Sequence, residues 1–414
     1  MKMKMILGLA LVTTGTWAAQ PAATTTDWPQ WHGPNRDNLS AETGLLKTWP
    51  ADGPALAWKT TDLGGGYSSV AVAGGRVYTE GDIGDESFVE ALDLATGEKL
   101  WQTKLGGAGG DHPGTRATPA VDGKLVYALN QFGELVCVQA ADGHEVWRKN
   151  LKSDFAGKMM SGWGNSESPL IVGDKLLCTP GGPGGTVAAL NKKTGATLWR
   201  SKDLIDNATY ASLIAVDIGG VPQVIVLTDA HVAGIATDTG KVLWKAPRAG
   251  KVAVVPTPIY KNGSVFVSSG YGIGCNQFKV VRNGNAFRAE QVYANTDMVN
   301  HHGGVILLGD HRSGFSDKGG WTCMDFKTGA VAWREHKLGK GTLSYADGHF
   351  YLRAESGPGT LVLLEASSDG WKESGRFNQP DRSGQQSWPH LVISNGKLFV
   401  RDQGTLLCSD IKQK

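Results

Sequence analysis

Histidine, tryptophan, arginine and amide side chains recur in this chain between short runs of β-forming residues. His301 and His302 are adjacent, and neutral imidazole is a ligand for Zn, Cu or Ni. Neighbouring residues of a strand point to opposite faces, so one ion would need one of the pair plus His112, His311 or His390. No HExxH spacing accompanies them. Two alternatives stay open: a transition-metal site with His301, His302 and His311 as candidate ligands, or a network of hydrogen-bonded histidines.

A wider set of side chains at such positions could contact a ligand. Indole rings stack on flat molecules, guanidinium and amide groups hydrogen-bond to oxygens, and carboxylates bind cations or act as bases. The candidates for ligand or cofactor binding are His112, Arg116, Trp163, Asn165, Glu167, Asn276, Gln277, His301, His302, His311, Arg312, Trp388 and His390, and the candidate catalytic base is Asp310. Polar residues gather at any solvated opening. Histidine, tryptophan, asparagine and arginine are more numerous in this set than contact with solvent alone requires, so we interpret the set as a binding site.

A repeated motif predicts the scaffold that positions these residues. Residues 91–101 read Ala-Leu-Asp-Leu-Ala-Thr-Gly-Glu-Lys-Leu-Trp, and a small residue, an Asp or Asn, a Thr-Gly pair and a Trp return along the chain. The recurring tryptophans are Trp58, Trp101, Trp147, Trp199, Trp244 and Trp333. Most neighbours in this series lie about forty to fifty residues apart, the period of a β-propeller blade.

The strand pattern predicts an all-β fold: a single eight-bladed propeller with four-stranded antiparallel blades. Seven blades run in sequence over residues 68–377, whereas residues 389–411 supply only three strands. The missing outer strand is at residues 55–60, so the two ends of the chain should complete the eighth blade and close the ring. Blade five has Arg288 where Trp is expected, and blade seven has Trp371 three positions early. We expect the least regular blade contacts at these two places.

Closure of the ring predicts where the chemistry lies. The loops between blades, and those between the second and third strands of each blade, should meet at one mouth of a central channel. We assign the candidate residues, Asp310 and His311 included, to these loops. The opposite end should carry mainly Asp-Gly, Gly-Gly and Thr-Gly turns.

The Ala-x-Asp-x-x-Thr-Gly-x-x-x-Trp motif resembles the repeat of the pyrroloquinoline-quinone-like (PQQ-like) propeller superfamily. The resemblance covers about residues 53–412. That superfamily includes quinoprotein alcohol dehydrogenases and the propeller lipoprotein of the outer-membrane β-barrel assembly machinery. The segment 27–36, Asp-Trp-Pro-Gln-Trp-His-Gly-Pro-Asn-Arg, also resembles a subgroup of exported bacterial members. The motif is structural, so it indicates fold more than activity.

The resemblance implies one enzymatic alternative, a PQQ- and Ca²⁺-dependent oxidoreductase acting on alcohols or sugars. Trp163 or Trp388 would then stack on the quinone, and Asn165 and Glu167 would face Ca²⁺. Arg116 or Arg312 would pair with quinone oxygens, and Asp310 would be the base. The adjacent cysteine pair typical of those dehydrogenases is missing, as is a CxxCH haem motif.

The first residues predict export. Lys2 and Lys4 precede an apolar stretch, and Thr16-Trp17-Ala18 is a small-x-small cleavage site, so residues 1–18 are interpreted as a signal peptide and 19–52 as a lead before the propeller at 53–414. No Cys follows the cleavage site, so no lipid anchor is expected. Without the two lysines the chain has 39 basic and 39 acidic residues, which gives no electrostatic basis for nucleic-acid binding.

Three of the five cysteines, Cys137, Cys323 and Cys408, share the small-residue position that opens the repeat. The blade count puts them in blades that are not neighbours, which is too far apart for disulfides. We interpret them as buried packing residues.

These observations lead to one function and two alternatives. The first choice is an exported, periplasmic or secreted propeller that binds a small molecule or a protein partner at the polar mouth of its channel. The alternatives are the PQQ- and Ca²⁺-dependent oxidoreductase and a scaffold in envelope assembly.

Overall fold

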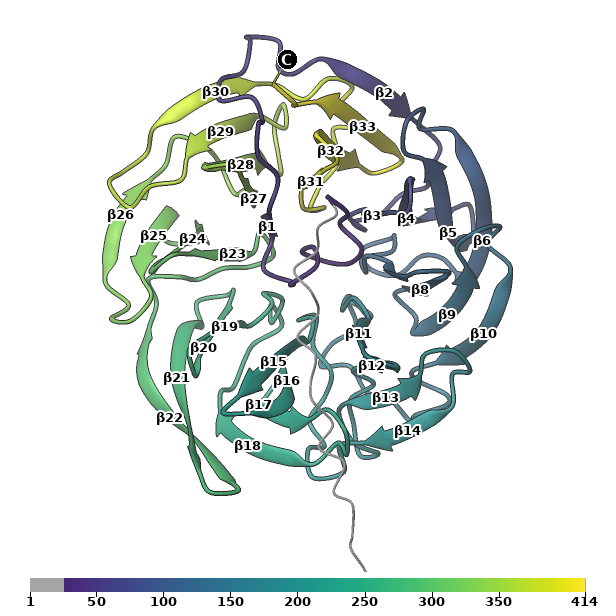
Figure 1. The fold of residues 1–414 in the computed structure, drawn as a ribbon, viewed down its shortest axis with the longest axis vertical. Coiled ribbons are helices and arrows are strands. Elements are labelled where there is room, and N and C mark those ends of the chain that lie inside the picture. The colour runs from purple at the N-terminus through teal and green to yellow at the C-terminus, as the bar shows by residue number, and fades with distance from the viewer. Residues whose placement is uncertain (1–25, 414) are drawn as a thin grey trace, which may run out of the picture.

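The computed structural model describes residues 26–413, and the predicted signal peptide lies outside them. The chain forms a ring of eight blades around a central channel (Figure 1). Each blade is a four-stranded antiparallel sheet, as predicted, and blade seven carries one additional short strand. Over the described range, no helix is long and apolar enough to span a membrane.

The blades follow one another around the ring, and strands are given from the centre to the rim. Blades one to four consist of β3 (Ala71–Ala73), β4 (Arg76–Ile83), β5 (Glu86–Asp93) and β6 (Lys99–Gly107); β7 (Ala120–Asp122), β8 (Leu125–Leu129), β9 (Glu134–Gln139) and β10 (Glu145–Asn150); β11 (Leu170–Val172), β12 (Lys175–Cys178), β13 (Ala188–Asn191) and β14 (Thr197–Arg200); and β15 (Ile214–Ile218), β16 (Val221–Leu227), β17 (His231–Ala236) and β18 (Val242–Pro247). Blades five to eight consist of β19 (Ile259–Lys261), β20 (Ser264–Ser269), β21 (Gly274–Asn283) and β22 (Ala286–Asn295); β23 (Val305–Leu308), β24 (His311–Ser316), β25 (Gly320–Asp325) and β26 (Val331–Glu335); β27 (Gly341–Ala346), β28 (His349–Ala354), β29 (Leu361–Glu365) and β30 (Glu373–Phe377); and β31 (Val392–Ser394), β32 (Lys397–Asp402), β33 (Thr405–Asp410) and β2 (Leu56–Thr60).

The two ends of the chain close the ring. β2 pairs antiparallel with β33, which places Trp58 opposite Cys408. The prediction that an N-terminal strand completes the last blade is confirmed. β2 covers the outer edge of β33, so the last blade has four strands like the others.

The repeat motif acts at the contact between neighbouring blades. Trp58 donates its indole N–H to the carbonyl of Leu94 at 3.0 Å, and its ring lies against Gly97. Gly97 has φ +74°, and a Cβ there would lie 2.5 Å from the indole. Glycine is therefore needed both for the turn and for the flat contact. The same N–H to carbonyl bond, at 3.0 Å, recurs for Trp101, Trp147, Trp199 and Trp333.

Blade five departs from the motif differently from the prediction. Its outer hairpin is long, so Arg288 lies near the tip opposite Val281. Tyr293 occupies the tryptophan position opposite Gln277 and donates its hydroxyl to the carbonyl of Phe326 at 3.1 Å. A tyrosine thus makes the blade contact, and counting from the turn at Asn283-Gly284 does not find it because the hairpin is long.

Blade seven is completed from another part of the chain. Gly375 stands opposite Leu363, at the position that Tyr293 occupies in blade five and Trp in the remaining blades. The backbone and Cβ of Trp49 fill the space over Gly375, and its ring lies 5.2 Å from Phe377 and 5.6 Å from Tyr351.

The segment at residues 26–52 runs through the centre of the ring (Figure 1). Trp28, 2 % exposed, pairs through its backbone with Val72 of blade one, and β1 (Leu39–Ser40) pairs parallel with β27 of blade seven. Arg36 donates to the carbonyls of Ser168 and Leu213 at 2.8 and 2.7 Å. Burial lowers the pKa of Arg36 to about 9. The bonds of Arg36 join the segment to the residues just before the inner strands of blades three and four.

The cysteines behave as small core residues. All five thiols are free and buried, and Cys137 and Cys323 lie opposite Trp147 and Trp333 in their blades. The prediction that Cys137, Cys323 and Cys408 pack in the core and are not bridged is confirmed.

Candidate functional site

The loops between blades meet at one end of the ring, the mouth, and enclose a cavity of about 320 Å³. Every one of the eight inter-blade loops supplies a lining residue. The loops after β20 and β28 add Tyr271 and Glu355. The lining residues are Trp31, Tyr67, His112, Arg116, Trp163, Ser166, Tyr210, Ser212, Val255, Tyr271, His301, His302, Lys340, Glu355, Gln386, Trp388 and His390.

Five rings form a closed circuit around this cavity. Starting from Trp388, the circuit runs through His302, His301, Trp163 and His112 and returns to Trp388. Successive centroids are 5.0, 4.8, 6.4, 5.6 and 5.8 Å apart. These are the separations of offset and edge-to-face aromatic contacts, so the rings support one another and present ring faces and edges to a ligand.

Tyrosines extend the aromatic wall. Tyr67 stacks on Trp388 at 4.2 Å, Tyr210 lies 5.6 Å from Trp163, and Tyr271 lies 4.9 Å from His301. Tyr271 is 46 % exposed, which places it at the opening.

Trp31 and His390 form the floor of the cavity, with His32 against them. Trp31 stacks on His32 at 4.0 Å and lies 4.6 Å from His390. His390 Nε2 donates to the carbonyl of His302 at 2.9 Å, so its Nδ1 is left to accept from His32 Nε2 at 3.0 Å. Burial lowers the pKa of His390 to about 4 and that of His32 well below its usual value, so both rings are neutral.

Three charged side chains line the cavity. Glu355 pairs with His302; burial opposes ionisation, but this hydrogen bond and the charge of Lys340 hold the pKa of Glu355 below its usual value. Lys340 pairs with Asp317 at 2.9 Å and donates to Nδ1 of His301 at 2.9 Å.

The third charge is Arg116. It donates to the carbonyl of His112, and burial lowers its pKa, with Tyr67 and Tyr210 acting in the opposite direction. Its Nη1 is buried with no acceptor among the described residues.

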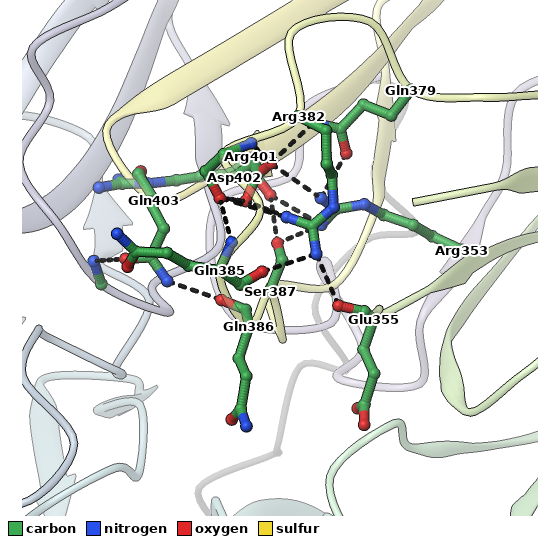
Figure 2. A network of polar contacts seen from close by, with 12 residues as sticks. Arg353, Glu355, Gln379, Arg382, Gln385, Gln386, Ser387, Arg401, Asp402 and Gln403 are labelled. Atoms are coloured by element: carbon green, nitrogen blue, oxygen red, sulfur yellow. Dashed lines mark hydrogen bonds and ion pairs between the residues drawn. The ribbon is translucent and has the colours of Figure 1, made fainter. Parts of the chain in front are cut away.

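A buried polar network holds one wall of the cavity in place (Figure 2). The fully buried carboxylate of Asp402 accepts from Arg382 at 2.6 Å, and Arg382 also donates to the carbonyl of Glu355 at 2.7 Å. Burial would raise the pKa of Asp402, but hydrogen bonds from Ser383 and Arg382 hold it below its usual value. In Figure 2 the side chains of Glu355 and Gln386 both point away from this network. The network therefore fixes the backbone that carries two lining residues.

Comparison with known proteins places this fold in a family. A family model described as "Outer membrane protein assembly factor BamB" matches residues 85–335, more than half of the chain. This chain belongs to that family. The BamB of Shewanella oneidensis is 26 % identical over 334 residues, covering 74 % of this chain and 79 % of that protein.

Two further similarities connect the BamB-family propeller to enzymes. A polyvinylalcohol dehydrogenase of a Pseudomonas species is 26 % identical over 211 residues, covering 49 % of this chain but only 29 % of that protein. The quinohemoprotein alcohol dehydrogenase of Comamonas testosteroni has a TM-score of 0.67 at 14 % identity, covering 95 % of this chain and 82 % of that one. At this identity the structural likeness establishes the fold alone. The resemblance to PQQ-like propellers is confirmed.

About half of the candidate residues from the sequence line the mouth cavity. They are His112, Arg116, Trp163, His301, His302, Trp388 and His390. All of them lie on loops between blades, where closure of the ring predicts convergence.

Other candidates near the mouth do not line this cavity. Asn165 donates to the carbonyl of Gln131 at 3.3 Å beside a neighbouring cavity of about 290 Å³. Glu167 is 2 % exposed and accepts from the hydroxyl of Thr179 at 2.6 Å; burial raises its pKa to about 7. Asn276 accepts from Arg248 at 3.2 Å, and Gln277 accepts from Tyr293 at 2.7 Å.

The placement of Asp310, His311 and Arg312 at the mouth is wrong. Leu308 pairs with His311, so Gly309-Asp310 is the tight turn between the first two strands of blade six, at the opposite end of the ring. Asp310 is an exposed partner of Lys261 at 2.7 Å. Arg312 is fully buried, 4.1 Å from the ring centroid of Phe266.

This correction removes the proposed metal set, because His311 cannot reach His301 and His302. Among residues 26–413, no three His, Cys, Asp or Glu side chains converge as a metal-binding group. The histidines at the mouth instead belong to the ring circuit and its hydrogen bonds.

The residues do not fit a quinone with Ca²⁺. Ca²⁺ needs several oxygen ligands, and Glu355, the one carboxylate in the cavity lining, is paired with His302. Asn165 and Glu167 are committed to the protein backbone and Thr179. With Asp310 at the opposite end, the base suggested for the enzymatic alternative is missing as well. We derive no quinone-dependent step.

Sequence reasoning missed several lining residues. Lys340 lies on an inter-blade loop and could be found by the rule that found Trp163; that rule also places Tyr67 and Tyr210 at the mouth. Trp31 could not, because its place depends on the path of the N-terminal segment through the ring, which tertiary contacts decide.

Proposed function

We propose that this chain is an exported BamB-family propeller that binds a small ligand in the mouth cavity. The observation that carries the proposal is the closed circuit of five rings around a cavity of about 320 Å³. That volume lies at the lower end of small-molecule sites, which are mostly apolar with a few placed polar groups.

The floor supports binding over passage. The segment at residues 26–52 runs through the centre of the ring, and its Trp31 lines the cavity beside His390. A ligand entering from the mouth would meet aromatic side chains of the loops and of this central segment. The site is therefore suited to holding a molecule.

A thermal-shift screen of small organic acids, amides and sugars tests the proposal. Ser166 lines the cavity, and Ser166→Phe should fill it. Any compound that raises the melting temperature of the parent protein should lose its effect in this variant. Ser153→Phe, at an exposed position, is the matched control and should keep the effect. Equal shifts in both variants would place binding elsewhere and reject the proposal.

Export is proposed from residues 1–18. The charged start, apolar stretch and small-x-small site support it, as does the outer-membrane role printed in the family name. A C-terminally tagged chain should be recovered from the periplasmic fraction, shortened by about 18 residues as that predicted site implies. Recovery of full-length chain from the cytoplasm would contradict export.

A second candidate function is a protein partner in outer-membrane protein assembly. The match of the family model over residues 85–335 supports this candidate. In vivo crosslinking of a tagged chain should capture components of the outer-membrane protein assembly machinery, identified by mass spectrometry. An exported tagged protein of unrelated fold is the control. Equal recovery of those components with both would reject this candidate.

A further inference from the structure

The charges in the mouth cavity are unequally compensated. The carboxylate of Glu355 is paired with His302, and the ammonium of Lys340 is paired with Asp317. Arg116 has no carboxylate within ion-pair distance among the described residues. It is thus the cation of the lining that has no direct ion pair, and the charge of Asp82 acts on it from a longer distance.

The surroundings of Arg116 make this unusual. Its guanidinium carries five N–H donors, yet its one hydrogen bond is to the carbonyl of His112, and Nη1 is buried without an acceptor. A guanidinium with one buried, unpaired N–H group costs free energy that an oxyanion would offset, because charge-assisted bonds to guanidinium are strong and planar.

The aromatic walls define the rest of the ligand. Trp388 and Trp163 flank His112 in the ring circuit, and the rings of both contact it. His112 lies on the same inter-blade loop as Arg116. A compact planar body fits between ring faces and edges in a cavity of this size. A second anionic group on the ligand would have to replace Glu355 as the partner of His302, or replace Asp317 as the partner of Lys340.

We propose that the mouth cavity selects a compact planar molecule carrying one oxyanion, which Arg116 binds. The inference rests on the proposed function and names its ligand class. A small aromatic carboxylate has the required chemistry, whereas a neutral sugar or amide leaves Arg116 uncompensated. A tricarboxylate such as pyrroloquinoline quinone carries more charge than the lining can pair.

Matched acids and amides test the inference. The probes are 4-hydroxybenzoate, nicotinate and indole-3-acetate, each with its primary amide, titrated into the mature protein by isothermal calorimetry. At least one acid should bind at least ten-fold more tightly than its amide, which corresponds to about 1.4 kcal/mol. Arg116→Gln should bring acid and amide to similar affinity. Arg116→Lys should keep a reduced preference for the acid, because the charge remains but the fork geometry is lost.

Arg288→Gln, an exposed arginine on the long hairpin, is the control and should bind as the parent does. Near-ultraviolet circular dichroism checks that the Arg116 variants fold. If Arg116→Gln does not fold, the inference is tested by comparing the acid preference of Arg116→Lys with that of Arg288→Gln. If acids and amides bind equally, or if the acid preference survives in both Arg116 variants, the inference is overturned while the proposed cavity stands. If no probe binds to the parent protein while the thermal-shift screen finds another ligand of the cavity, the inference falls and the proposed function stands; if neither experiment finds a ligand, both fall.

Discussion

Acidification should destabilise this protein through the floor of the cavity. The pKa of His390 is lowered to about 4 by burial, against an ordinary value of 6.5, so the folded state resists the proton that the unfolded state accepts. Stability from this neutral ring is complete well above pH 6.5 and is lost as the pH falls toward 4. Between pH 7 and pH 5, linkage gives a loss of about 2 kcal/mol in the free energy of unfolding.

Urea unfolding at pH 7, 6 and 5 measures this loss in the parent and in His390→Gln. Glutamine can still accept from His32 and donate to the carbonyl of His302, but it does not titrate. Other buried groups, such as Glu167, titrate in both proteins, and the raised pKa of Glu167 acts in the opposite direction. The informative quantity is therefore the difference between the two proteins, expected at about 2 kcal/mol.

The exposed His144→Gln is the control and should follow the parent. Parallel pH profiles for the parent and His390→Gln would refute the reasoning, because a neutral buried His390 requires them to diverge.

Two further substitutions test the scaffold. Gly143→Ala should lower the free energy of unfolding by about 2–4 kcal/mol, since Gly143 has φ +75° and a Cβ would lie 2.6 Å from Trp101. Gly123→Ala, also at positive φ but in open space, is the control and should lower it by only about 1 kcal/mol. Equal losses in urea unfolding would contradict the blade contact. Asp402→Asn should lower the free energy of unfolding by about 3 kcal/mol or more, because it leaves buried arginines without their anion. Asp310→Asn, at an exposed ion pair, is the control and should change the melting temperature little. An unchanged stability in Asp402→Asn would show that the network does not hold the cavity wall.

The fold could be predicted from the sequence because the same motif recurs in most blades. The Thr-Gly turn is set by neighbouring residues, whereas Trp101 packs on the turn of the next blade, 39 residues along the chain at Ala140. Closure followed from counting strands. The role of Tyr293 was not predicted, because the motif does not specify the length of the hairpin. Counting from the turn therefore gave Arg288 as the residue at the tryptophan position.

The site could be predicted only in part. Loops between blades converge in any closed ring, which is why Trp163 and Trp388 were found. Asp310 was misplaced because a two-residue turn looks the same at either end of a blade. Trp31 and Trp49 depend on the route of the N-terminal segment across the ring, which no local pattern in the sequence specifies.

Fluorine NMR of 5-fluorotryptophan-labelled protein tests the central claim most directly. Tryptophan-to-phenylalanine variants would assign the signals. A compound found in the thermal-shift screen should move the signals of Trp31, Trp163 and Trp388, which line the cavity, and leave Trp101 and Trp147, which join blades, in place. Binding that moves the blade tryptophans and not the cavity tryptophans would contradict the account.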